Sequence, residues 1–92
     1  MKSNEALVQS KKNVVLRLKR IEGQLRAIQK MIDEGESCEN VAQQMSASRA
    51  ALDKAFFAMI ACAMDDYIGQ GGSQTEMQQR LGGLSALIAK FG

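Results

Sequence analysis

The sequence contains no histidine and no proline, and it has only two cysteines among its 92 residues. Without proline, the residue that most strongly breaks helices is absent, so long helical segments can continue. Without histidine, the chain lacks the usual acid-base group and a common metal ligand. No Gly-rich phosphate loop and no nucleophile beside an evident base are present either. We therefore predict that the chain is not an enzyme and has no catalytic residues.

The sequence also lacks two kinds of apolar segment. It does not open with the charged and then apolar stretch of a secretion signal, and no apolar run reaches membrane-spanning length. We therefore expect a soluble, cytoplasmic protein with no membrane partner, forming a single domain over 1–92. Two cysteines are too few for a disulfide scaffold, and in the cytoplasm they are more often reactive or metal-binding than structural.

Apolar residues recur at alternating steps of three and four, which is the spacing of one helix face. The predicted fold class is all-α, with a protomer of three helices over about 5–34, 38–68 and 73–90. Gly35 ends the first apolar stripe, and Ser37 and Ser73 are the expected N-caps of the next two helices.

The second helix is predicted to be about 45 Å long. A compact chain of this size has a radius of gyration of only about 12 Å, so its own domain cannot cover such a helix. We therefore expect a second copy to bury part of its apolar surface, in a dimer or a larger even-numbered assembly.

Positive charge is concentrated at the start of the chain. Residues 1–30 hold eight of the twelve basic residues but only two of the ten acidic ones. This asymmetry indicates either a polyanionic partner or an ordinary solvated helix face. A basic helix face could lie along DNA phosphates through charge and counterion release. Arg17, Arg20 and Gln24 share one face of the first predicted helix, and Arg49 and Lys54 add positive charge to the second.

The two cysteines, Cys38 and Cys62, lie 24 residues apart within the second predicted helix. That spacing corresponds to about 36 Å along a helix axis, so the two thiols cannot meet within one chain. Two antiparallel copies crossing at Ala50 would set Cys38 of one copy against Cys62 of the other. The alternative is a pair of small buried hydrophobes, which the position of Cys62 on the apolar stripe favours.

Cys38 is predicted to lie in the first helical turn, where backbone N–H groups and the helix dipole stabilise a thiolate. Glu36 and Glu39 oppose that effect. Two thiolates could bind Cu(I), with Met59 or Met64 assisting. Zinc is disfavoured, because it requires more ligands and imidazole is absent. The same thiols could instead form a disulfide or a sulfur-bridged link after oxidation or persulfidation.

Two segments together resemble the CsoR/RcnR/FrmR family of transcriptional repressors, over roughly residues 11–68. The first is the basic run Arg17-Leu18-Lys19-Arg20-Ile21-Glu22-Gly23-Gln24-Leu25. The second is Cys38 followed by Val41, Gln44-Met45-Ser46-Ala47 and Ala51-Leu52. The resemblance implies an all-α protomer, an antiparallel dimer and a dimer-of-dimers tetramer. It also implies a repressor that binds double-stranded operator DNA without effector and releases it with effector.

Within this resemblance, Arg17 and Lys54 match the family's DNA-contact positions, with Lys19, Arg20 and Arg49 as their neighbours, and Cys38 matches the first sensor cysteine. The candidate DNA-binding residues are thus Arg17, Lys19, Arg20, Arg49 and Lys54. Metal-sensing members carry a histidine 25 residues after that cysteine and a cysteine or histidine four residues further on, where this chain has Ala63 and Tyr67. The formaldehyde-sensing branch uses an N-terminal proline, which is absent. The persulfide-sensing branch uses two cysteines and no histidine, which this chain matches in kind but not in spacing.

These observations predict a homotetrameric, DNA-binding repressor whose effector acts at a thiol pair between Cys38 and Cys62 of the partner subunit. Reactive sulfur or another thiol-modifying signal is the favoured effector, and no cofactor is required. The first alternative keeps the repressor and makes Cu(I) the effector, bound by the same thiolates. The second alternative is a structural helical oligomer with buried, inert thiols and no DNA.

Overall fold

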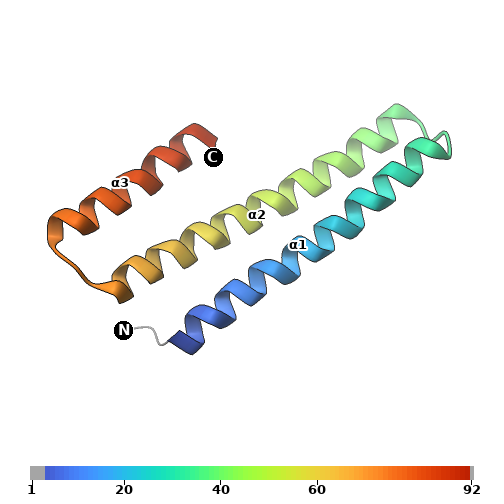
Figure 1. Cartoon of the computed structure of the whole chain (residues 1–92). Coiled ribbons are helices and arrows are strands. Elements are labelled where there is room, and N and C mark those ends of the chain that lie inside the picture. Colours follow the sequence, from blue (N-terminus) through green and yellow to red (C-terminus); the bar gives the residue numbers. More distant parts are fainter. Residues whose placement is uncertain (1–3, 92) are drawn as a thin grey trace.

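The computed structural model describes residues 4–91, so residues 1–3 and 92 of the predicted 1–92 domain lie outside the described part. The described residues form three α-helices: α1 (Asn4–Asp33), α2 (Cys38–Gln70) and α3 (Gln74–Phe91). The prediction of an all-α chain with three helices is confirmed. Figure 1 shows α1 and α2 as a long antiparallel hairpin, with α3 folded back beside the C-terminal half of α2.

The turn between α1 and α2 is formed by residues with a strong local preference for it. Gly35 adopts a φ of 80°, a left-handed conformation that glycine accepts without steric cost. Its backbone N–H donates to the carbonyl of Ile32 at 3.1 Å. Ser37 then caps α2, because its Oγ accepts a hydrogen bond from the backbone N–H of Asn40 at 3.1 Å. This confirms Ser37 as the N-cap and makes Cys38 the first residue of α2.

The contact between α1 and α2 is a single seam with a seven-residue repeat, as in coiled coils. Each side chain in it is at most 8% exposed. The seam residues are Val14, Ile21 and Ile28 from α1, and Val41, Ser48, Ala55 and Cys62 from α2. Apolar burial of this kind stabilises the hairpin, since each deeply buried aliphatic side chain contributes about 1.5–3 kcal/mol.

A second apolar row runs beside this seam and stays uncovered in the single chain. Its members are 39% to 58% exposed. This apolar row consists of Leu18, Leu25 and Ile32 from α1, and Met45, Leu52 and Met59 from α2. The molecule measures 56 × 29 × 13 Å with a radius of gyration of 17.4 Å, well above the value of about 12 Å for a compact chain of this size. The hairpin is therefore too thin to cover its own long helices.

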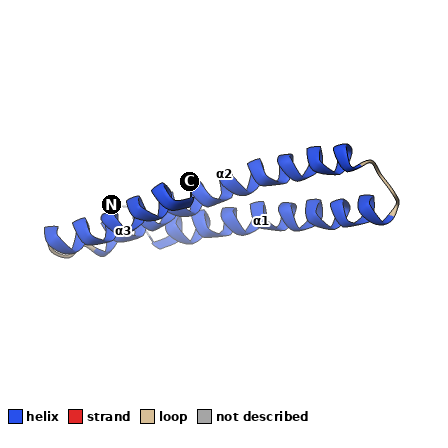
Figure 2. Cartoon of the chain, turned by 90° about the horizontal axis from the view of Figure 1, so that it is seen from above, coloured by secondary structure: helices blue, strands red, loops and turns tan. Residues whose placement is uncertain are grey.

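Helix α3 packs against α2 and makes no contact with α1 within the described residues. In the view from above in Figure 2, α3 overlaps one end of the hairpin formed by α1 and α2. Ser73 precedes α3 and accepts a hydrogen bond from the backbone N–H of Glu76 at 3.0 Å, as predicted for its cap. The guanidinium of Arg80 lies 5.6 Å from the centre of the Tyr67 ring, a cation–π contact that ties α3 to α2. No described helix is long and apolar enough to cross a membrane.

Candidate nucleic-acid interface and thiols

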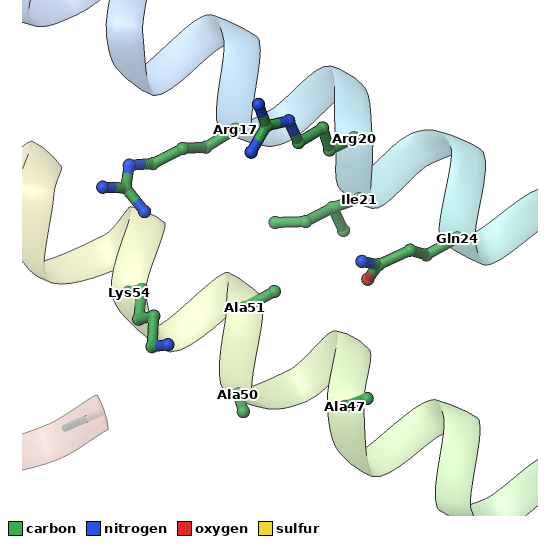
Figure 3. A pocket seen from close by; sticks show the side chains of 8 residues that line it. All are labelled: Arg17, Arg20, Ile21, Gln24, Ala47, Ala50, Ala51 and Lys54. Atoms are coloured by element: carbon green, nitrogen blue, oxygen red, sulfur yellow. The ribbon is translucent and has the colours of Figure 1, made fainter.

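A hollow of about 370 Å³ lies between the two long helices on one side of the seam. We call it the basic groove, and Figure 3 shows its lining side chains. From α1 it is lined by Arg17, Arg20, Ile21 and Gln24, and from α2 by Ala47, Ala50, Ala51 and Lys54. It therefore brings three cations and a neutral amide onto one concave surface.

Helical spacing explains why these side chains meet. Arg17, Arg20 and Gln24 follow one another at steps of three and four, so they share one face of α1. The facing residues of α2 are short alanines, which leave room between the helices. Lys54 completes the group from the other wall of the groove.

The charges of the groove differ from the other cations of α1. Arg26 pairs with Glu22 at 3.6 Å, and Lys30 pairs with Glu34 at 3.7 Å. By contrast, neither of these ion pairs involves the arginines and the lysine that line the basic groove. The groove therefore gathers three cations on one surface, which is the electrostatic requirement for binding a polyanion.

The structure divides the five predicted DNA-binding residues into two groups. Arg17, Arg20 and Lys54 line the basic groove. Lys19 is exposed on α1 and does not line it, and Arg49 borders a separate hollow with Ala42, Met45 and Ser46. Only the first group lines the groove.

Cys38 is exposed at the start of α2. It borders an apolar hollow of about 360 Å³, whose other lining residues are Ile32, Glu36, Val41, Ala42 and Met45. Two of these, Ile32 and Met45, belong to the apolar row, so Cys38 lies at one end of the surface that a single chain leaves uncovered. Its thiol is accessible to a reagent from solvent.

Cys62 has the opposite environment. It is only 3% exposed and lies in the seam under α1. A hollow of about 230 Å³ beside it is lined by Ser10, Asn13, Val14, Arg17, Ala58, Ala61 and Asp65. The burial agrees with the alternative in which Cys62 is a core residue. The pairing of Cys38 with the partner's Cys62 involves two copies and stays a prediction, and it would require α1 to uncover Cys62.

The described part of one chain does not bring together the ligands of a metal site. Among residues 4–91, no three cysteine, aspartate or glutamate side chains come close enough to hold a metal ion together. Ala63 and Tyr67, at the positions where metal-sensing members carry ligands, are half-buried. The Tyr67 ring is already engaged by Arg80. A Cu(I) site built from Cys38 and Cys62 would therefore need both chains of a dimer.

Sequence reasoning missed two features of the groove. It considered Ala50 only as the crossing point of two copies, which stays a prediction, and did not expect the alanines Ala47, Ala50 and Ala51 to line the groove. The steps of four and three from Ala47 to Ala51 and Lys54 are the signal that could have assigned them to one face. It also missed a hydrogen bond from the Ser48 hydroxyl to Oε1 of Gln24, at 3.1 Å. That bond joins two helices, so no local pattern reveals it.

The fold matches a solved structure described as the nickel-responsive transcriptional regulator InrS. The TM-score is 0.70 at 30% sequence identity, over 88% of this chain and 91% of that one. The three-helix architecture is thus that of a transcriptional regulator. Residues 10–90 match the family described as metal-sensitive transcriptional repressor, and the chain belongs to this family. Membership confirms the predicted resemblance and the prediction that the chain is not an enzyme.

Similarity to a curated relative points the same way. The chain is 42% identical over 52 residues to the copper-sensing transcriptional repressor RicR of Mycobacterium tuberculosis (strain ATCC 25618 / H37Rv). The matched region covers 56% of this chain and 54% of the relative, so the chain spans about half the length of that protein in the match.

Proposed function

We propose that this protein is a cytoplasmic repressor that binds operator DNA through the basic groove and releases it when an effector acts on its thiols. The observation that carries this proposal is the cluster of Arg17, Arg20 and Lys54, which two helices bring onto one concave surface. The cluster is continuous with the surroundings of a thiol, because Arg17 also lines the hollow beside Cys62.

DNA is the polyanion that suits this surface best. Duplex DNA carries about one negative charge per 1.7 Å of its axis, and cations that neutralise phosphates release condensed counterions. The alanines of the groove let a backbone approach closely, and the three cations lie on two helices that the seam holds in fixed register. Such contacts set the position of the protein on the duplex without reading its sequence.

We infer that a second copy covers the apolar row. Met45 and Met59 are each seven residues from Leu52, so antiparallel α2 helices centred on Leu52 would set Met45 of one copy against the partner's Met59. Leu52 is 49% exposed in the single chain and belongs to the row, whereas Ala50 belongs to the groove. Two such dimers would form the tetramer that the family resemblance implies.

Leu52→Glu is expected to convert the assembly to monomers, because it would bury two uncompensated charges at the centre of the interface. Light scattering coupled to size exclusion would measure the mass. Leu16→Glu is the matched control, since Leu16 is 57% exposed but lies outside the apolar row. Retention of the parent mass by Leu52→Glu would show that the row is not the interface.

The same register explains how thiol chemistry could reach the groove. In this register the partner's Cys62 is offset from Cys38 by four residues, which is about 6 Å along the axis of α2. Because Cys62 is covered by α1, linking it to Cys38 requires α1 to move, and α1 carries Arg17 and Arg20. The effector then favours a conformation in which the groove residues of α1 are displaced. The affinity for DNA falls because this conformation binds DNA more weakly than the effector-free one.

A reactive sulfur species is the effector we favour. The Cys38 thiolate would take a sulfur atom from a polysulfide, which supplies the oxidising equivalents and leaves as a shorter polysulfide. Attack by the partner's Cys62 on the Cys38 sulfur would then form a disulfide and expel hydrosulfide. The alternative effector is Cu(I), favoured by the similarity to copper-sensing RicR and by the soft thiolate and thioether groups of Cys38 and Met45.

Fluorescence anisotropy of the protein on labelled DNA from upstream of its own gene tests the proposal, under anaerobic conditions. We expect binding without effector, and release by polysulfide but not by Cu(I). Release by Cu(I) alone would establish the copper alternative. Absence of binding at low salt would contradict the repressor itself and favour the structural oligomer.

A further inference from the structure

The seam contains one polar residue at a position where its neighbours in the repeat are apolar. Ser48 is 6% exposed, and it lies between Val41 and Ala55 in the α2 row of the seam. A buried hydroxyl needs a partner, because an unsatisfied one costs about 1–3 kcal/mol. Ser48 finds its partner on α1, where its hydroxyl donates to Oε1 of Gln24 at 3.1 Å. An alanine would fill this position without any such requirement.

The partner of Ser48 lies on the functional surface. Gln24 is exposed and lines the basic groove with Arg17, Arg20 and Lys54. Its amide oxygen is engaged by Ser48, so its NH2 group is turned away from that contact. Figure 3 shows the Gln24 amide at one end of the groove, with its nitrogen on the side of the hollow. The amide thus offers two N–H donors in a place where the neighbouring side chains are cations.

We propose that Gln24 donates a hydrogen bond to a DNA phosphate in the basic groove and that Ser48 is the residue that positions it. This inference rests on the proposed function, and it adds a neutral contact to the three cationic ones. A hydrogen bond to a charged acceptor is worth more than one between neutral groups. Because Ser48 restrains the long glutamine side chain before DNA arrives, binding costs less conformational entropy.

The neutrality of Gln24 gives this contact a distinctive signature. Removing a cation lowers both the affinity and the dependence of affinity on salt, since fewer counterions are released. Removing a neutral donor lowers the affinity and leaves the salt dependence unchanged. A phosphate contact carries no sequence information, so the affinity falls equally on operator and on unrelated duplex DNA.

The experiment measures the Kd by anisotropy over a range of salt, on operator and on unrelated duplex, together with the melting temperature. Gln24→Ala is expected to weaken binding about tenfold with the salt slope unchanged. Ser48→Ala is expected to weaken it about threefold, because Gln24 is still present but no longer held. In the Gln24→Ala background, Ser48→Ala is expected to weaken binding no further. This non-additivity would show that Ser48 affects DNA binding through Gln24.

Gln29→Ala is the matched control, because Gln29 is exposed on α1 but does not line the groove. It should leave the Kd unchanged. If Gln24→Ala lowers the melting temperature but leaves the Kd within twofold, the hydrogen bond only joins the helices and the inference is overturned. Weakening confined to operator DNA would overturn the phosphate assignment in favour of a base contact.

Arg17→Ala in the same titrations separates this inference from the proposed function. If Arg17→Ala weakens binding and lowers the salt slope while Gln24→Ala does neither, the groove binds DNA and only the role of Gln24 is wrong. If neither variant changes the affinity, the basic groove itself is not the DNA-binding surface.

Discussion

Replacing Arg17 and Lys54 together by alanine is expected to weaken operator binding by about 100-fold at moderate salt. These residues supply two of the three cations of the basic groove, one from each long helix, and every copy in the assembly would lack both. The slope of log K against log salt should become shallower by about 0.9 for each phosphate that the protein no longer neutralises. Anisotropy titrations at several salt concentrations would measure both quantities.

The double variant Lys19→Ala, Arg49→Ala is the matched control, because it removes the same number of positive charges from each chain. Neither residue lines the groove, so we expect a much smaller decrease in affinity. A larger decrease from this pair than from Arg17 and Lys54 would mean that DNA lies elsewhere on the hairpin. Circular dichroism should show unchanged helicity in both double variants, since all four side chains are exposed.

Cys38→Ala is expected to bind operator DNA as the parent does and to lose its response to the effector completely. Cys38 is exposed and far from the groove cations along α2, so the substitution leaves both the seam and the groove intact. Only the thiol that solvent can reach is removed. Release of DNA by polysulfide, followed by anisotropy, is the measurement.

Cys62→Ala distinguishes a thiol pair from a single reactive thiol. This variant has a smaller buried side chain and should be about 1 kcal/mol less stable, while its groove stays in place. If the pair is the switch, polysulfide still modifies Cys38, as mass spectrometry would show, but DNA is not released. A normal response from Cys62→Ala would mean that Cys38 acts alone. A normal response from Cys38→Ala would refute the sensing proposal as a whole.

The helices and their ends follow from local signals, which is why they could be predicted. The apolar steps of three and four define the helical faces of the chain. Gly35 and Ser37 terminate one helix and start the next through contacts within a few residues. The placement of Cys38 at the start of α2 needs no tertiary information for the same reason.

The candidate site could be predicted only in part. Arg17, Arg20 and Gln24 share a face of one helix, which the spacing alone shows. That Lys54 faces them across a groove, and that Arg49 does not, depends on the rotation of α2 against α1. A change of one residue turns a helix by about 100°, so the sequence pattern leaves this rotation open.

Composition and periodicity were sufficient to predict a helical chain with a basic first helix and two thiols too distant to meet in one copy. The burial of Cys62, the exposure of Cys38 and the bond between Ser48 and Gln24 emerged only from the packed helices. The physical reason is that a helix presents every residue on some face, and only its partner decides which face is covered. In this protein, the packing of α1 against α2 buries Val14 and Ile21 of α1 together with the seam residues of α2.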